Sequence, residues 1–167
     1  EGLIEVAKRG AQTEDLEAEF YVGDARSMEF APEFDGAICL CQGAFGIAGD
    51  DDAHLRVLKA IARSLRPNAP FVLSAISALA LARRIAENAD FDALSATQCE
   101  AITIRNPEGD ERETDVFTTA FTARELKWLL REAGFQTPEF FGGTAGQYSP
   151  KSLEINDFEI VALTRRA

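Results

Sequence analysis

The amino-acid sequence predicts an α/β domain with a mostly parallel sheet, flanking helices and a small antiparallel insertion. Several apolar runs of strand length, such as residues 35–41 and 70–75, are continuous rather than alternating, which is typical of strands buried on both faces of a parallel sheet. Amphipathic helix patterns stand between these runs, so strands and helices follow one another as in right-handed crossover units. Because no repeat or linker divides the chain, we expect one domain over residues 1–167.

The first part of the chain predicts one helix and two strands. Residues 3–10 carry apolar side chains at helical spacing and end at a glycine, so they predict the last turns of a helix. Residues 18–22 are aromatic and β-branched, and a Gly-Asp pair follows them, so they predict a buried strand with Asp24 at its carboxyl end. Residues 35–41 predict the next strand, which ends in the glycine-containing loop 42–46.

Two helices and a strand follow. Three aspartates precede apolar positions at helical spacing, and acidic side chains favour the start of a helix, so residues 51–65 predict a helix. An Arg-Pro-Asn sequence ends it, and residues 70–75 then predict a buried strand. A second helix is predicted from about residue 79 to residue 88.

An antiparallel hairpin is predicted next, within an insertion over about residues 97–121. Residues 99–105 alternate between polar and apolar side chains, and residues 106–110 (NPEGD) have the composition of a turn. Residues 113–121 predict the returning strand. This pattern differs from that of the crossover units before it.

The last part of the chain predicts one more helix and two closing strands. Thr122 stands three residues before Glu125, which is the spacing of a capping box, and leucines at helical spacing follow until Gly134. Residues 137–141 and 158–164 predict strands on either side of a long loop, and these strands complete the sheet.

Composition and charge exclude several classes of protein. Lys and Arg number 17 against 28 Asp and Glu, and the net charge of −11 repels phosphate backbones and anionic lipids, so nucleic acid is not expected as a partner. The longest nearly apolar stretch, residues 71–82, is shorter than the ~20 residues that span a bilayer, so no membrane segment is predicted. Three cysteines without metal-ligand spacing predict neither a disulfide framework nor a metal site, and they favour a cytoplasmic location.

The loops after the first two predicted strands hold the candidate functional residues. In open α/β sheets, ligands collect beyond the carboxyl ends of the strands. There the Asp24 carboxylate is able to accept a hydrogen bond from an exocyclic amine, while neighbouring backbone N–H groups donate to a ring nitrogen. Together these groups suit the edge of an adenine. The alternative is that Asp24 only caps its own turn.

Five segments in a fixed order carry a resemblance to a known family. They are FYVGDARSMEF, FDGAICLCQGAFG, LKAIARSLRPNAPFVLSA, FTARELKWLLREAGF and FEIVALTRR. The succession resembles the class I S-adenosylmethionine-dependent methyltransferases, and most closely their small-molecule group, in which a short antiparallel insertion precedes the last helix. The resemblance covers essentially the whole chain. It implies a Rossmann-like fold, S-adenosylmethionine as cofactor and methyl transfer to a small-molecule acceptor.

The resemblance also implies roles for particular residues. In the family, the position of Asp24 binds the adenine amino group, and the position of Ala25 offers its backbone N–H to the ring. Arg26 belongs to the same loop and is included in the cofactor site. The cofactor contacts implied on the ribose and methionine side are Cys41, Gln42 and Gly43. The resemblance directs Phe45 and Gly46 toward the acceptor. Two further candidate acceptor contacts follow from position rather than from the resemblance: His54, which comes after the loop that borders the active face, and Tyr148, in the long loop between the last two predicted strands. His54 is expected to be exposed in the first turn of its charged helix.

One departure from the family pattern concerns the start of the chain. Members open with a strand and a glycine-rich loop, followed by a second strand that ends in an acidic residue, and neither strand is present here. Residues 1–8 resemble the helix after that second strand. Since the only methionine is Met28 and the sequence starts within an element, we expect a fragment of a longer methyltransferase. The alternative is a chain that covers its exposed sheet edge in another way, as a homodimer does.

The sequence is also compatible with two other functions. A non-catalytic, truncated α/β domain would dimerise or bind a protein partner through the uncovered sheet. A nicotinamide-dependent oxidoreductase shares the layered fold, and only the GDAR and CQGAFG segments argue against it. Methyl transfer requires alignment of the reactants rather than a dedicated nucleophile, so the sequence assigns no catalytic residue.

Overall fold

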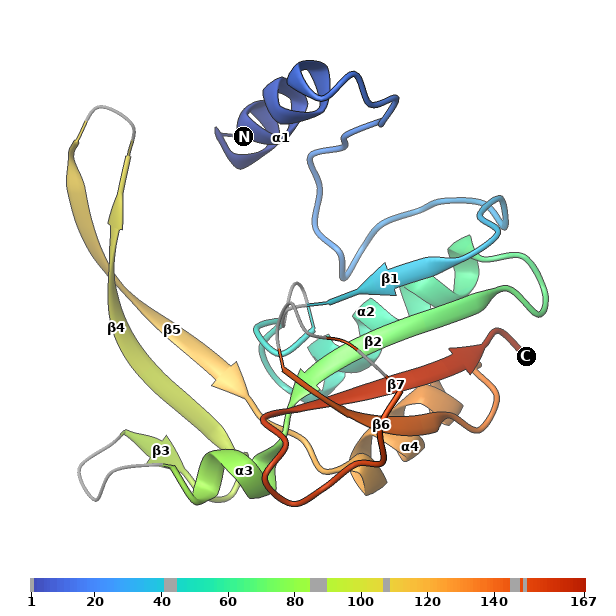
Figure 1. Cartoon of the computed structure of the whole chain (residues 1–167), viewed down its shortest axis with the longest axis vertical. Coiled ribbons are helices and arrows are strands. Elements are labelled where there is room, and N and C mark those ends of the chain that lie inside the picture. Colours follow the sequence, from blue (N-terminus) through green and yellow to red (C-terminus); the bar gives the residue numbers. More distant parts are fainter. Residues whose placement is uncertain (1, 41–44, 85–89, 107–108, 145–147, 149) are drawn as a thin grey trace.

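The computed structural model describes residues 2–40, 45–84, 90–106, 109–144, 148 and 150–167. Within them, the chain forms a four-stranded sheet in the order β1-β2-β7-β6 and a three-stranded sheet in the order β3-β4-β5 (Figure 1). The helices are α1 (Gly2–Thr13), α2 (Asp51–Ser64), α3 (Ala78–Ala82) and α4 (Ala123–Glu132). The strands are β1 (Ala37–Cys39), β2 (Pro70–Ile76), β3 (Phe91–Asp92), β4 (Thr97–Arg105), β5 (Glu111–Thr119), β6 (Glu139–Gly143) and β7 (Glu159–Arg165).

The four-stranded sheet confirms the α/β class, although it contains one parallel pair and two antiparallel pairs. β1 and β2 are parallel, because α2 carries the chain back between them. β7 runs antiparallel to both of its neighbours, because the chain reverses direction after β6 and enters between β6 and β2. The predicted predominance of parallel pairs is therefore not found among the described strands.

The core lies between this sheet and two helices, α2 and α4, which cover the same face (Figure 1). Phe71 and Leu73 are two residues apart in β2, so both side chains point to the face that the helices cover, and both are fully buried. Phe71 also stacks on Phe135, with 4.9 Å between the ring centroids. Complete burial of a side chain of this size contributes about 1.5–3 kcal/mol to folding, so this packing holds the helical layer against the sheet.

The opposite face of the sheet is open. Ile38 of β1 is 75% exposed, and Leu163 of β7 is also exposed. α1 stands apart from the sheet in Figure 1, and none of its residues is buried. The helix predicted for residues 3–10 is therefore confirmed, but it lies outside the core.

The two longest helices of the core begin where their capping residues predict. Asp50 caps α2 by accepting a hydrogen bond from the backbone N–H of Ala53 at 2.8 Å. Thr122 and Glu125 form the predicted capping box of α4, in which the Glu125 N–H donates to Thr122 Oγ1 at 3.2 Å. Among the helices that the structure describes, none combines the length and the apolar character needed to cross a bilayer.

Two predicted elements differ from the structure. Residues 18–22 form no strand, and Tyr21 and Val22 are 62% and 64% exposed. A strand needs a neighbour for its backbone hydrogen bonds, and β1, at the edge of the described sheet, pairs only with β2. The helix predicted for residues 79–88 is the short α3, while residues 85–89 lie outside the described part of the chain.

The predicted antiparallel hairpin is confirmed. It consists of β4 and β5, is here called the arm, and projects from the domain (Figure 1). β4 pairs with β5 along its whole length. At the turn, Gly109 has a φ of +95°, a conformation that glycine adopts without strain. At its base, the arm is joined to the domain by the Thr119 N–H, which donates to the carbonyl of Gly46 at 2.8 Å. The arm thus stands beside the loop that leads into α2.

Candidate functional site

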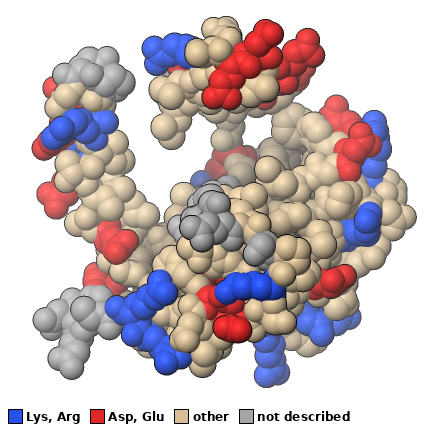
Figure 2. Space-filling model, viewed as in Figure 1, with Lys and Arg blue, Asp and Glu red and all other residues tan. Residues whose placement is uncertain are grey.

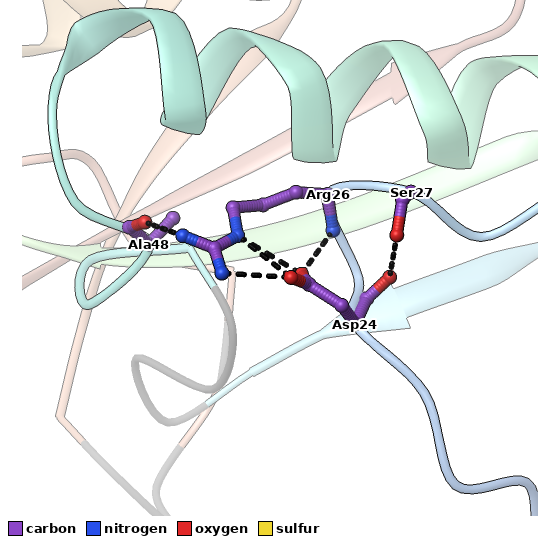
Figure 3. Close-up of polar contacts among 4 residues, drawn as sticks. All are labelled: Asp24, Arg26, Ser27 and Ala48. Atoms are coloured by element: carbon purple, nitrogen blue, oxygen red, sulfur yellow. Dashed lines mark hydrogen bonds and ion pairs between the residues drawn. The ribbon is translucent and has the colours of Figure 1, made fainter.

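Asp24 and Arg26 form a polar cluster in the segment before β1 (Figure 3). The Asp24 carboxylate accepts hydrogen bonds from Arg26 N at 2.9 Å, Arg26 Nε at 3.0 Å and Arg26 Nη2 at 2.7 Å. The Nη1 of the same guanidinium donates to the carbonyl of Ala48 at 3.2 Å. One arginine therefore connects the Asp24 turn to the loop that leads into α2.

The contacts with Arg26 keep Asp24 ionised. Hydrogen bonds from the Arg26 side chain, and then from its backbone N–H, lower the pKa of Asp24 to about 2. The bond from the Arg26 N–H is the turn-capping interaction that the sequence allows as the alternative role. The Asp24 side chain is nevertheless 46% exposed, and the N–H of Ala25 donates to no described residue. An acceptor and a donor thus stand next to each other at the surface.

A groove of about 790 Å³ lies between this region and the arm. Arg26 and residues 47–50 form one wall, and residues of the second sheet, including Cys99, Asp115 and Phe117, form the other. Small-molecule sites usually have volumes of about 300–1,000 Å³. The hollow beside the arm is visible at the left of Figure 2.

Phe45 and His54, both predicted to contact the acceptor, lie in the core and are fully buried. Their rings pack with Phe121, at centroid distances of 4.8 Å from Phe45 to Phe121 and 5.2 Å from His54 to Phe121. The expected exposure of His54 is wrong, because the helical period places it with Leu58 and Ile61 on the face of α2 that packs against the sheet.

His54 is expected to make the stability of the protein depend on pH. Burial lowers the pKa of His54 below its ordinary value of 6.5, against smaller opposing effects of the Gly46 backbone and the Asp51 charge. No described residue forms a hydrogen bond of good geometry with either ring nitrogen. In the unfolded chain, the imidazole takes up a proton near pH 6.5, whereas the folded protein resists protonation. The unfolded state therefore binds more protons, and the free energy of unfolding is expected to fall as the pH falls below 6.5.

Urea denaturation at about pH 7.5 and about pH 5.5 measures this loss. His54 is the only histidine, so the loss is expected to be smaller in a His54→Phe variant, whose ring does not titrate. Asp24, with its pKa of about 2, titrates below this range. An equal loss in both proteins would show that His54 has the same proton affinity in the folded and unfolded states.

The other predicted acceptor and cofactor residues lie in three places. Gly46 is buried at the base of the arm. The Tyr148 hydroxyl donates to Glu159 Oε2 at 2.9 Å, and the Tyr148 ring lines an apolar hollow with Val72 that does not include Asp24. Residues 41–43, predicted as Cys41, Gln42 and Gly43 of the cofactor site, lie outside the described residues. The structure thus brings the Asp24 loop to the groove, but not Phe45, His54 or Tyr148.

The groove also contains residues that the sequence did not indicate, among them Asp90, Asp115 and Phe117. Asp90 lies in a different segment from Asp115 and Phe117, so no local spacing marks the three residues as one site. The one available signal is the alternation of the hairpin, which places Asp115 and Phe117 on one face. Within the described residues, no group of three or more His, Cys, Asp or Glu side chains is arranged to hold a metal ion.

Comparison with solved structures identifies the fold, whereas no protein-family model and no curated protein matches the chain. An S-adenosylmethionine-dependent methyltransferase from Clostridium acetobutylicum matches 99% of this chain with a TM-score of 0.75, at 15% sequence identity. The chain has the fold of the S-adenosylmethionine-dependent methyltransferases. It spans 72% of the length of that structure.

Two further methyltransferase structures share this fold. One, from Methanosarcina mazei, is 22% identical, matches 98% of this chain and 76% of its own, and has a TM-score of 0.68. The other is the 1,6-didemethyltoxoflavin-N1-methyltransferase from Burkholderia thailandensis, solved with 1,6-didemethyltoxoflavin and S-adenosylhomocysteine bound. It is 20% identical, matches 95% of this chain and 55% of its own, and has a TM-score of 0.53. The Rossmann-like α/β class implied by the sequence is therefore confirmed.

Proposed function

We propose that the protein acts in methyl transfer from S-adenosylmethionine to a small-molecule acceptor. The observation that supports this most is the match of nearly the whole chain, arm included, to a methyltransferase structure. The Burkholderia enzyme, which has the same fold, was solved with 1,6-didemethyltoxoflavin bound. The groove beside Arg26 has a volume that suits an acceptor of that kind.

The Asp24 turn fits the adenine end of the cofactor. The ionised carboxylate is suited to accept a hydrogen bond from the exocyclic amine, and the N–H of Ala25 is suited to donate to a ring nitrogen. Arg26 holds the carboxylate through its side chain and so orients the accepting oxygens. By the family resemblance, Cys41, Gln42 and Gly43 take the ribose and methionine side.

The chemistry requires the chain to align the reactants and to exclude water. S-adenosylmethionine, when bound, supplies a methyl group on a positively charged sulfur. The protein holds the nucleophilic atom of the acceptor in line with that methyl group, and such alignment lowers a barrier by about 7–11 kcal/mol in favourable cases. The bond from Arg26 to Ala48 and the bond from Thr119 to Gly46 fix the two walls of the groove.

Asp24→Ala is expected to weaken the binding of S-adenosylhomocysteine to this chain more than about tenfold. The variant loses a hydrogen bond usually worth about 0.5–1.5 kcal/mol, and a donor left without a partner adds about 1–3 kcal/mol. Isothermal titration calorimetry measures the change in the dissociation constant.

Asp35→Ala is the matched control for this experiment. Asp35 also pairs with an arginine, Arg66, but it precedes β1 and lies outside the groove. Its replacement is therefore expected to leave the dissociation constant unchanged. An unchanged affinity in Asp24→Ala would contradict the adenine assignment, and a wild-type chain that does not bind S-adenosylhomocysteine would contradict the proposed function.

A further inference from the structure

The groove beside Arg26 combines apolar surface with unbalanced negative charge. Ile47 and Phe117 line it, and both side chains are more than half exposed. Four carboxylates also line it: Asp50, Asp90, Asp92 and Asp115. Arg26 is the one lysine or arginine among the described lining residues, and its guanidinium is already paired with Asp24. Figure 2 shows further carboxylates along the arm.

Two of the four carboxylates are free to pair with a ligand. Asp50 caps α2, and Asp92 accepts a hydrogen bond from the Ser95 hydroxyl at 2.6 Å. The side chains of Asp90 and Asp115 form no hydrogen bond or ion pair with any described residue. Partial burial, and then the charges of Asp115 and Asp90, raise the pKa of the Cys99 thiol in the groove wall. The wall therefore favours a positively charged ligand.

The register of the arm brings an aromatic ring and a free carboxylate to one face. In an antiparallel pair, opposite residues share a face, as do residues two apart on one strand. Phe117 lies opposite Cys99, and Asp115 is two residues from Phe117, so these three side chains share the face that borders the groove. An aromatic ring beside a carboxylate suits an organic ammonium ion, through cation–π attraction and through an ion pair.

We infer that this groove binds the methyl acceptor and that the acceptor is an organic amine in its ammonium form. The ammonium group lies toward Asp115 and Asp90, and the apolar part lies against Phe117 and Ile47. The inference rests on the proposed function, whose substrate class it names. On transfer, the amine releases one proton to solvent and its nitrogen lone pair forms the new N–C bond. The electron pair of the broken C–S bond stays on sulfur, so the products are a methylated ammonium ion and a neutral thioether.

Three probes of similar size separate the effect of charge from that of shape: phenethylamine, phenethyl alcohol and hydrocinnamate. Each is titrated into the wild-type chain at low salt, and binding is followed by NMR. Phenethylamine is expected to bind at least about tenfold more tightly than phenethyl alcohol, and hydrocinnamate more weakly than either. Equal affinities for the three probes, or a preference for hydrocinnamate, would overturn the inference.

Two variants then locate the effect in the groove. Asp115→Asn is expected to weaken phenethylamine binding at least about fivefold and to leave phenethyl alcohol binding unchanged. Glu100→Gln makes the same charge change at a residue of the arm that does not line the groove, because Glu100 is next to Cys99 in β4 and its side chain therefore points to the other face of the arm. This variant is expected to change neither affinity. Equal weakening by both variants would overturn the inference, since net charge alone would then explain it.

Calorimetry with S-adenosylhomocysteine on the same samples separates this inference from the proposed function. A chain that binds S-adenosylhomocysteine but shows no preference for phenethylamine overturns the substrate class alone. A chain that prefers phenethylamine but does not bind S-adenosylhomocysteine supports the charge preference of the groove and overturns the proposed function.

Discussion

Phe45→Ala is expected to lower the free energy of unfolding by about 3–5 kcal/mol, the usual cost of removing a buried aromatic ring. The Phe45 ring is fully buried, stacks on Phe121 and contacts the His54 ring at a centroid distance of 5.3 Å. Alanine would leave a cavity between α2 and the base of the arm. Because a domain is stable by only about 5–15 kcal/mol, this loss is a large fraction of the total.

Urea denaturation followed by circular dichroism measures this loss. Phe117→Ala is the matched control, since the same substitution at a ring that is 60% exposed is expected to change the free energy of unfolding by no more than about 0.5 kcal/mol. The experiment also separates two interpretations of Phe45. If Phe45→Ala weakened phenethylamine binding with little loss of stability, Phe45 would be the ligand contact that the sequence predicts, and its place in the core would be wrong.

The starts of the helices show how much local sequence determines. α2 and α4 begin at the predicted caps because the hydrogen bonds of Asp50 and Thr122 are made within four residues of the chain. The arm could also be predicted, since turn residues separate its two strands. These elements are determined by interactions between residues that are close in the sequence, so the sequence alone is enough to predict them.

Strand pairing depends on distant parts of the chain, and there the sequence misleads. Residues 18–22 have the composition of a strand, but composition supplies no partner for the backbone hydrogen bonds. The apolar run that becomes β7 indicates burial, which is observed, but it carries no information about strand direction. The predominance of parallel pairs was inferred from burial and from the alternation of strands with helices. Burial is common to both kinds of sheet, and the helix between β1 and β2 makes only that pair parallel.

The burial of His54 could be predicted from the sequence, whereas the residues of the groove could not. His54 stands four residues before Leu58 and seven before Ile61, so the helical period already places it on the apolar face, although the aspartates before it favour exposure. The groove has no such signal. Arg26 and Asp115 lie far apart in the chain. They line one groove only because the arm stands beside the loop that leads into α2 (Figure 1).

Gly142→Ala is expected to lower the free energy of unfolding by about 2–5 kcal/mol, from overpacking and from the loss of hydrogen bonds. A Cβ atom at Gly142 would lie 1.8 Å from Asp157 Oδ2. Asp157 cannot move away without cost, because its buried carboxylate pairs with the Lys151 ammonium and accepts a hydrogen bond from the Glu154 N–H at 2.8 Å. The hydrogen bond from Lys151 lowers the pKa of Asp157, so the displaced group would be an ionised carboxylate without partners.

The effect of Gly142→Ala depends on one carboxylate, and a double-mutant cycle followed by urea denaturation therefore tests it. In an Asp157→Ala background, Gly142→Ala is expected to cost less than in the wild-type chain, with a coupling energy of about 0.5–3 kcal/mol. Gly10→Ala is the control, because a Cβ atom there meets nothing within 4 Å, and alanine in a helix is more stable than glycine by about 0.5–1 kcal/mol. If Gly142→Ala costs the same in both backgrounds, the backbone of β6 must shift to accept the methyl group, and Asp157 does not constrain this strand.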